Sequence, residues 1–381
     1  MAEKPKIAVF TGGGDCPGLN NAIKRIVHGA AGHFDIDGIV QGWQGSISMA
    51  LNPDAETIET FTIPLDVEQV RRIDRQGGTM LMSSRANPYN HDGKDVSDEV
   101  LNFLNSRYHA VVAIGGEDTL GAAGKLAKKG LRVVGIPKTI DKDLCGTEYT
   151  LGFDSAVNRV TDYVKIMKST AGSHGMTYFI EVMGRKAGHL TYWGGKAANV
   201  HFMTIPEVET DHQRLFSIIQ ERKKSMPIRR GFTGDGRRYT IVLVSEGTEL
   251  KGVGSIKKGK VDSHGNMILG GVADYLCAEY IRETKDEDAR SPTIGHYQRS
   301  GDPSNKDGIM AEMFANRALK LIGSEMFGRI VTAEGAAVGD TPLDVVIGRI
   351  RVLDVPKCYN TGTFQPKPLE DQLYHEVEVS K

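Results

Sequence analysis

Short apolar runs alternate with longer amphipathic stretches along the first half of the chain. Runs rich in Val and Ile predict strands at residues 6–10, 37–40, 110–114 and 132–136. Apolar residues at helical spacing predict helices at about 17–33 and 120–130. This order of strand, helix and strand is typical of a parallel sheet that is covered by helices on both faces.

The same alternation continues through the second half. Further strands are predicted at 178–182, 198–205, 239–246 and 329–335, and further helices at 213–225, 270–284 and 308–322. A stretch rich in Lys and Gly at 249–270 predicts an exposed hairpin or loop, and the tail from Pro356 predicts an irregular surface strap. We therefore predict an α/β protein of two Rossmann-like lobes with parallel-sheet cores, between which the chain crosses more than once.

Composition and charge narrow the class of protein. At 381 residues, the chain is longer than one compact domain usually is, and its 40% of hydrophobic residues can form a large core. The formal net charge of -1 gives no general attraction for nucleic acid, and no apolar segment is long enough to span a membrane. Four scattered cysteines without a C-x-x-C pair indicate reduced thiols. We expect a cytoplasmic protein with neither a nucleic acid nor a membrane partner.

Two glycine clusters follow predicted strands and precede predicted helices. They are GGGDCPG at 12–18 and GGEDT at 115–119. Successive glycines and a helix N-terminus together favour a phosphate-binding loop, and the carboxyl ends of parallel strands face one crevice. No G-K-[ST] follows, so the first loop is not a P-loop. The alternative for each cluster is a tight turn between a strand and a helix.

Carboxylates and a lysine accompany these glycines. Glu117 and Asp118 beside a phosphate favour a bound Mg²⁺, although they would also suit the capped start of a helix. After the strand at 132–136 come Lys138, Thr139, Asp141 and Asp143 on one loop. A carboxylate base, a lysine and Mg²⁺ are the groups that phosphoryl transfer to an alcohol requires. The alternative interpretation of this loop is an ordinary polar turn.

These segments and four others, in the same order, resemble the 6-phosphofructokinase family. The matching segments are 13–20, 77–85, 115–118, 137–143, 183–185, 245–246 and 295–301, and order and spacing agree from about residue 5 to 315. The resemblance implies the phosphofructokinase fold. It also implies a donor-binding lobe at 1–152 plus about 297–345, and a sugar-phosphate-binding lobe at about 153–296 plus 346–381.

The resemblance also implies the roles of individual residues. Asp141 would take the proton from the 1-hydroxyl of the sugar, Thr139 would hold the moving phosphoryl group, and Glu117 would stand at the metal position. Donor contacts would be Gly13, Arg85, Asp118 and Lys138; sugar contacts Thr139, Asp143, Met183, Gly184, Arg185 and Glu246; and contacts to the sugar 6-phosphate Arg290, His296 and Arg299. Arg185 and Lys138 would also assist catalysis.

Two positions bear on the identity of the donor. Asp118 and Lys138 stand where ATP-using members of the family have Gly, which is the pattern of pyrophosphate-dependent members. An Asp fills the path of an α-phosphate, and a Lys can neutralise the terminal phosphate of pyrophosphate. The resemblance thus implies reversible, Mg²⁺-dependent transfer from pyrophosphate to fructose 6-phosphate in glycolysis. Because Arg290 would reach a neighbouring chain's substrate, it further implies a homodimer or homotetramer.

Two departures from the family pattern leave alternatives open. Met176 replaces an Arg that reaches the 6-phosphate, which permits another acceptor such as sedoheptulose 7-phosphate or inositol. Lys142 replaces an Asn, and this cation either weakens Asp141 as a base or points to solvent. The remaining alternatives are an ATP-dependent phosphofructokinase and a catalytically impaired regulatory subunit.

Overall fold

The computed structural model describes residues 4–226, 239–261, 267–369 and 373–379. The chain forms two compact units and passes between them more than once. The first unit comprises Met1–Ser155, Arg299–Ile350 and Val377–Lys381, and the second comprises Ala156–Gln298 and Arg351–Glu376. The binding of the donor by one unit and of the sugar phosphate by the other stays a prediction.

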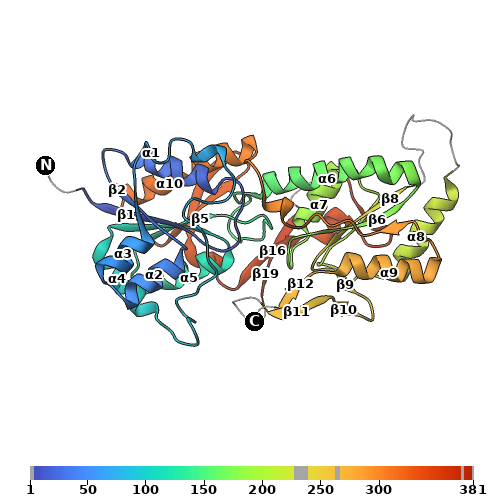
Figure 1. The fold of residues 1–381 in the computed structure, drawn as a ribbon, viewed down its shortest axis with the longest axis horizontal. Helices are drawn as coiled ribbons and strands as arrows, with labels where there is room; N and C mark the ends of the chain where they lie inside the picture. The colour runs from blue at the N-terminus through green and yellow to red at the C-terminus, as the bar shows by residue number, and fades with distance from the viewer. Residues whose placement is uncertain (1–3, 227–238, 262–266, 370–372, 380–381) are drawn as a thin grey trace. The chain divides into compact units, whose positions relative to one another are not determined.

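The first unit is built on a seven-stranded sheet in the order β15-β14-β5-β4-β1-β2-β3. Figure 1 labels its strands β1, β2 and β5. The strands are β1 (Lys6–Thr11), β2 (Asp35–Ile39), β3 (Thr62–Leu65), β4 (Ala110–Gly115), β5 (Val133–Pro137), β14 (Arg329–Glu334) and β15 (Ala337–Pro342). The five central strands are parallel, which confirms the predicted core. The two edge strands, β3 and β15, are antiparallel to their neighbours and were not predicted.

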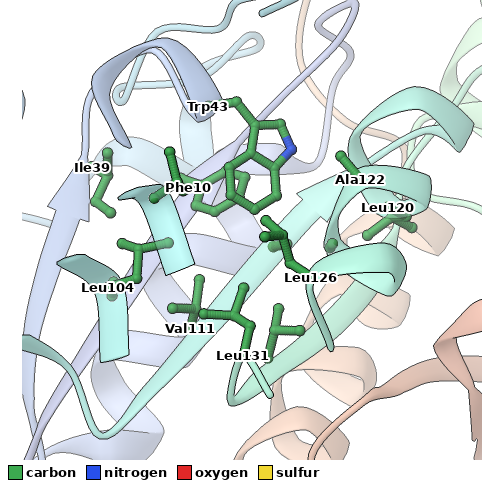
Figure 2. Close-up of a cluster of buried hydrophobic side chains, with 14 of the residues drawn as sticks. Phe10, Ile39, Trp43, Leu104, Val111, Leu120, Ala122, Leu126 and Leu131 are labelled. Atoms are coloured by element: carbon green, nitrogen blue, oxygen red, sulfur yellow. The ribbon is translucent and has the colours of Figure 1, made fainter. Parts of the chain in front are cut away.

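Helices cover both faces of this sheet. They are α1 (Leu19–Ala30), α2 (Trp43–Leu51), α3 (Ala55–Phe61), α4 (Ser97–Arg107), α5 (Glu117–Lys128) and α10 (Asn305–Gly323), with short 3-10 turns η1 (Ile73–Arg75) and η3 (Leu343–Val346). On one face, a buried cluster joins Phe10 and Val111 of the sheet to Trp43, Leu104 and Leu126 of three helices (Figure 2). On the other face, α10 packs on β5 and β14, and α1 packs against α10. Every residue of β4 is buried, as a doubly covered strand requires.

The second unit has a four-stranded sheet in the order β13-β6-β8-β7, and all its neighbouring strands are parallel. The strands are β6 (Thr177–Val182), β7 (Phe202–Thr204), β8 (Thr240–Ser245) and β13 (Ala289–Arg290). The helices are α6 (Phe153–His174), α7 (His189–Ala197), α8 (His212–Ser225), α9 (Val272–Thr284) and the 3-10 helix η2 (Gly295–Arg299). Helix α9 packs on β6 and β13, while α7 packs on β7 and β8. Helices α8 and α9 and the sheet are joined through the rings of Phe179, Phe216 and Tyr280.

Short strand pairs complete the second half of the chain. The predicted hairpin region contains two antiparallel pairs, β9 (Glu249–Leu250) with β10 (Gly254–Ser255), and β11 (Lys257–Val261) with β12 (Met267–Leu269). Residues 262–266 of that region lie outside the described residues. After the short helix α11 (Val355–Cys358), the tail contains β17 (Tyr359–Asn360) paired with β18 (Gln365–Pro366). The last strand, β19 (Tyr374–Glu378), pairs with β16 (Arg349–Leu353), which precedes α11.

The prediction of an irregular surface strap is therefore wrong for much of the tail. Cys358, Tyr359 and Phe364 are buried, and the carbonyl of Phe364 accepts a hydrogen bond from the backbone N–H of Met203 at 2.9 Å. The prolines of the tail suggested irregular backbone, but the apolar residues between them pack on the second unit and outweigh that local preference.

All four cysteines are buried and lie outside any disulfide. Burial raises the pKa of the Cys16 thiol to about 12, so it stays protonated near neutral pH. In the part of the chain that the structure describes, no helix is both long and apolar enough to cross a membrane.

Candidate functional site

Three loops of the first unit meet at the carboxyl ends of adjacent strands. Strand β4 lies between β1 and β5, and Gly115 of β4 is in register with Pro137 of β5. The backbone N–H of Gly12 donates to the carbonyl of Ile114 at 3.0 Å, and that of Lys138 donates to the carbonyl of Gly115 at 2.9 Å. The two glycine loops and the loop from Lys138 are therefore neighbours, at the edge of the sheet where α/β proteins bind ligands.

Glycine is required in the first of these loops. A Cβ atom at Gly12 would lie 2.6 Å from the side-chain oxygen of Thr119, and Gly13 has a φ of +80°. A Cβ at Gly13 would also lie 3.6 Å from the Nζ atom of Lys138. The backbone thus comes close to both the first turn of α5 and a cation, and this geometry suits a bound oxyanion.

Two cations lie against this loop. The ammonium of Lys138 is only 2% exposed and donates to the carbonyl oxygen of Gly14. The Nη1 atom of Arg299 donates to the carbonyl of Asp15 at 3.2 Å. Burial, together with the nearby charge of Arg299, lowers the pKa of Lys138 to about 8, although the carboxylates of Asp141 and Asp15 act in the opposite direction. Such a cation is ready to neutralise an anion that enters the loop.

The segment that precedes Arg85 wraps around the first loop. The backbone N–H of Gly13 donates to the carbonyl of Ser84 at 2.9 Å, and the hydroxyl of Ser83 donates to the carbonyl of Gly13 at 2.5 Å. Asn20, at the start of α1, accepts a hydrogen bond from the N–H of Met80 at 2.8 Å. Segment 77–85 is thus fixed to the first glycine loop, and Arg85 follows directly.

Asp141 lies in the third loop and is 5% exposed. Its backbone N–H donates to the hydroxyl of Thr139 at 3.1 Å. Its Oδ1 atom is buried and has no hydrogen-bond partner among the described residues, which leaves an acceptor available to a ligand. The next residue, Lys142, has a φ of +57° and holds its Nζ atom 5.2 Å from the centre of the Phe153 ring. Lys142 therefore makes a cation–π contact with this ring.

The acidic residues of these loops fit a magnesium ion that is shared with phosphate. No group of three or more His, Cys, Asp or Glu side chains able to hold a metal occurs among the described residues. Mg²⁺ in phosphoryl-transfer sites needs only one or two carboxylates, because substrate phosphates and water supply the other oxygens. Glu117 opens α5, and the preceding Gly116 packs against Lys138 and Thr139. The carboxylate of Glu117 is a hard donor of the kind that Mg²⁺ prefers, and phosphates held by the glycine loop would supply further oxygens.

The second unit holds another predicted cluster, at the end of β6. The Oε1 atom of Glu246 accepts hydrogen bonds from the backbone N–H groups of Gly184 at 3.2 Å and Arg185 at 3.0 Å. Arg185 has a φ of +50°, and a Cβ at Gly247 would overlap its carbonyl oxygen. Glu246 and Gly247 thus hold the segment Met183–Arg185 in one unusual backbone conformation.

Sequence reasoning missed one residue of this second cluster. Gln298 is 1% exposed; its Oε1 atom accepts from the N–H of Met183 at 3.1 Å, and its Nε2 atom donates to the carbonyl of Gly295 at 3.0 Å. It ties η2 to the end of β6. Its place in the segment 295–301 was the available signal, but an amide between His and Arg gave no reason to single it out.

The other predicted residues of the second unit are less closely grouped. Arg290, on β13, folds back and donates to the carbonyls of Glu287 at 2.5 Å and Ala289 at 2.7 Å. His296 is exposed on η2. The sulfur of Met176 accepts from the hydroxyl of Tyr178 at 3.2 Å.

The structure therefore divides the predicted site residues into two sets. The first unit holds Gly13, Arg85, Glu117, Asp118, Lys138, Thr139, Asp141, Asp143 and Arg299, and the second holds Met183, Gly184, Arg185, Glu246, Arg290 and His296. Within the first set, Gly13, Arg85, Lys138, Thr139, Asp141 and Arg299 lie on segments joined by the contacts above. Within the second, Met183, Gly184, Arg185 and Glu246 are so joined.

Comparisons with known proteins identify the family of this chain. The family model described as Phosphofructokinase matches residues 6–322. A pyrophosphate–fructose 6-phosphate 1-phosphotransferase of Dictyoglomus thermophilum is 39% identical over 95% of this chain and 99% of its own length. An ATP-dependent 6-phosphofructokinase 2 of Clostridium perfringens is 34% identical over 93% and 95%.

A solved structure shows the same fold. The crystal structure of a pyrophosphate-dependent phosphofructokinase from Nitrosospira multiformis, 18% identical, covers 99% of this chain and 98% of its own, with a TM-score of 0.76. The family model and the curated relatives both match the segments that hold the predicted site residues, so they show the family of the chain as well as its fold. The chain belongs to the phosphofructokinase family.

Proposed function

We propose that this protein transfers a phosphoryl group from pyrophosphate to the 1-hydroxyl of fructose 6-phosphate, reversibly and with Mg²⁺, as a step of glycolysis. The observation that carries the choice of donor is the position of Lys138, a residue that is Gly in ATP-using members of the family. Its buried ammonium lies against the backbone of Gly13 and Gly14. A compact ammonium suits a small, doubly charged phosphate. The names of several relatives support the same donor and acceptor.

The loops of the first unit suit each part of this reaction. Asp141 accepts the proton of the attacking hydroxyl at its orphaned Oδ1 atom. Thr139 and Lys138 hold the oxygens of the transferred and leaving phosphates, and the backbone of Gly13 and the side chain of Arg85 hold the donor. Glu117 would hold Mg²⁺ together with phosphate oxygens. When bound, the ion neutralises charge on the phosphates.

The second unit suits recognition of the sugar phosphate. We assign the sugar hydroxyls to the segment Met183–Arg185 and to Glu246, whose backbone contacts fix their positions. Arg290 and His296 are assigned to the 6-phosphate. Arg290 is exposed on β13, and we propose that it serves a neighbouring chain in a homodimer or homotetramer in the cytoplasm.

The identity of the acceptor is tested by comparing sugars. Met176 offers no charge to a phosphate, which favours a second candidate function in which pyrophosphate phosphorylates sedoheptulose 7-phosphate or inositol. Steady-state rates with each acceptor, pyrophosphate and Mg²⁺ separate the two. We expect fructose 6-phosphate to give the highest kcat/KM. A rate near background with fructose 6-phosphate, and turnover with another acceptor, would establish the second candidate.

Lys138 predicts a pH dependence of donor use. Its pKa is lowered to about 8, so in the free enzyme the ammonium loses its proton as the pH rises through that value. We expect kcat/KM for pyrophosphate to fall above pH ~8, because this quantity reports groups of the free enzyme. In Lys138→Met, kcat/KM for pyrophosphate should be lower overall and should no longer fall above pH ~8. If kcat/KM of the variant still falls above pH ~8, another group is responsible for the fall.

The lowered pKa of Lys138 also makes the stability of the protein depend on pH in the absence of pyrophosphate. Between pH ~8 and the usual lysine value, 10.5, the unfolded chain binds the proton that the folded chain has lost. The contribution of Lys138 to the free energy of unfolding therefore rises with pH across this window.

A further inference from the structure

Asp307, near the start of α10, lies at the centre of a buried hydrogen-bond network. It is 0% exposed. Its Oδ1 atom accepts from the hydroxyl of Tyr149 at 2.7 Å and from the N–H of Gly152 at 2.8 Å. Its Oδ2 atom accepts from the N–H of Ser155 at 2.9 Å and from the hydroxyl of Ser155 at 2.5 Å. The carboxylate therefore receives four hydrogen bonds from one short segment, residues 149–155.

This arrangement requires an ionised carboxylate. All four partners donate, and only an ionised Asp can accept at both oxygens without presenting a hydrogen of its own. Burial raises the pKa of Asp307, and the hydrogen bonds from Ser155 and Tyr149 oppose that rise. An Asn in its place would turn an amide N–H₂ toward two of the donors, whichever way its side chain is oriented.

The segment held by Asp307 is in turn fixed to the proposed catalytic loop. The hydroxyl of Thr150 donates to the carbonyl of Thr139 at 2.7 Å, and the N–H of Leu151 donates to the carbonyl of Pro137 at 3.0 Å. These contacts reach the residues on either side of Lys138.

The same segment also touches the first glycine loop. The thiol of Cys16 donates to the carbonyl of Leu151 at 3.4 Å. A Cβ at Gly18 would lie 3.6 Å from the Cβ of Asp307, so the end of that loop packs directly on this residue. Asp307 thus lies where the catalytic loop and the donor loop are both anchored.

We propose that Asp307 is a positioning residue, which sets the placement of Lys138 and Thr139 relative to the Gly13-Gly14 backbone through segment 149–155. It touches no substrate in this account. The inference rests on the proposed function, because the loops that it aligns are those assigned to phosphoryl transfer. Misplacement of a reacting group by about 1 Å can cost about 10²-fold in rate.

The test compares Asp307→Asn with a matched buried carboxylate. Asp37, on β2, is 2% exposed and pairs with Lys6 at the amino end of β1, away from the loops. We expect Asp307→Asn to lower kcat about 10²-fold while KM for fructose 6-phosphate changes little. Asp37→Asn should cost stability without this loss of kcat. A folded Asp307→Asn protein with kcat within twofold of the wild type would overturn the proposal.

A second pair of variants decides the matter if Asp307→Asn does not fold. Thr150→Val keeps the shape of the side chain and removes its hydrogen bond to Thr139, whereas Thr150→Ser keeps the hydroxyl. We expect a roughly tenfold fall in kcat for the first and recovery with the second. Equal kcat in the two variants would contradict the proposed link between segment 149–155 and the catalytic loop.

Hydrogen exchange separates this inference from the function itself. We expect Asp307→Asn to speed exchange of the amides in 149–155 and 137–143, and Asp37→Asn to leave both protected. If the wild-type protein shows no turnover with pyrophosphate, the proposed function fails, while this exchange pattern still supports Asp307 as the anchor. Unchanged exchange in Asp307→Asn would reject the anchor whatever the activity.

Discussion

Replacing Asp141 with Asn is expected to lower kcat about 10³-fold, within the range that removal of a general base usually costs. Asn keeps the size of the side chain but cannot take a proton from the attacking hydroxyl. Asp141 is nearly buried, and its Oδ1 atom has no hydrogen-bond partner among the described residues, so the substitution breaks no hydrogen bond at that atom. Initial rates with pyrophosphate and fructose 6-phosphate measure the effect.

Asp143→Asn is the matched comparison, because it removes a carboxylate two residues further along the same loop. We assign Asp143 to the sugar, so its loss should raise KM for fructose 6-phosphate more than it lowers kcat. Thermal unfolding of both variants shows whether the loop has remained folded. If Asp141→Asn retains kcat within tenfold of the wild type, Asp141 is not the base.

The double change Asp118→Gly with Lys138→Gly is expected to reverse the donor preference. Loss of the buried ammonium on the Gly13-Gly14 loop should lower kcat/KM for pyrophosphate by about 10²-fold or more, as loss of one preorganised contact to developing charge does. Loss of Asp118 from the first turn of α5 removes a negative charge from the path of an α-phosphate. Rates with ATP should therefore rise.

The single change Lys138→Met separates the effect of charge from that of space. It should lose use of pyrophosphate as the double variant does, without a comparable gain with ATP, because the Met side chain still fills the site. A donor preference that stays the same in the double variant would show that this pair of residues does not select the donor.

The elements of the fold that the sequence predicts best are those with regular periodicity. The strands at 6–10, 110–114 and 132–136 are apolar along almost their whole length because helices cover both faces, and the structure confirms them. The edge strands β3 and β15 were missed, since each ends in or contains Pro and carries exposed or half-buried residues. Helix α6 was also missed, although its 22 residues are amphipathic.

The placement of site residues was predictable where a local motif determines it. The strand-to-helix glycine loops had to lie at the carboxyl ends of their strands, and adjacent strands brought them together. Contacts between distant parts of the chain were not predictable. Asp307 reaches Gly152 from 155 positions away, and no short pattern marks such a pair. The direction of Lys142 was equally undetermined, because it depends on the position of Phe153.

The central claim is the choice of donor, and one measurement tests it most directly. Initial rates of the purified protein are measured with Mg²⁺ and fructose 6-phosphate, using pyrophosphate or ATP across a range of concentrations. The buried Lys138 beside Gly14, with Asp118 at the start of α5, predicts a kcat/KM for pyrophosphate about 10²-fold or more above that for ATP. An ATP value equal to or above the pyrophosphate value would contradict this account.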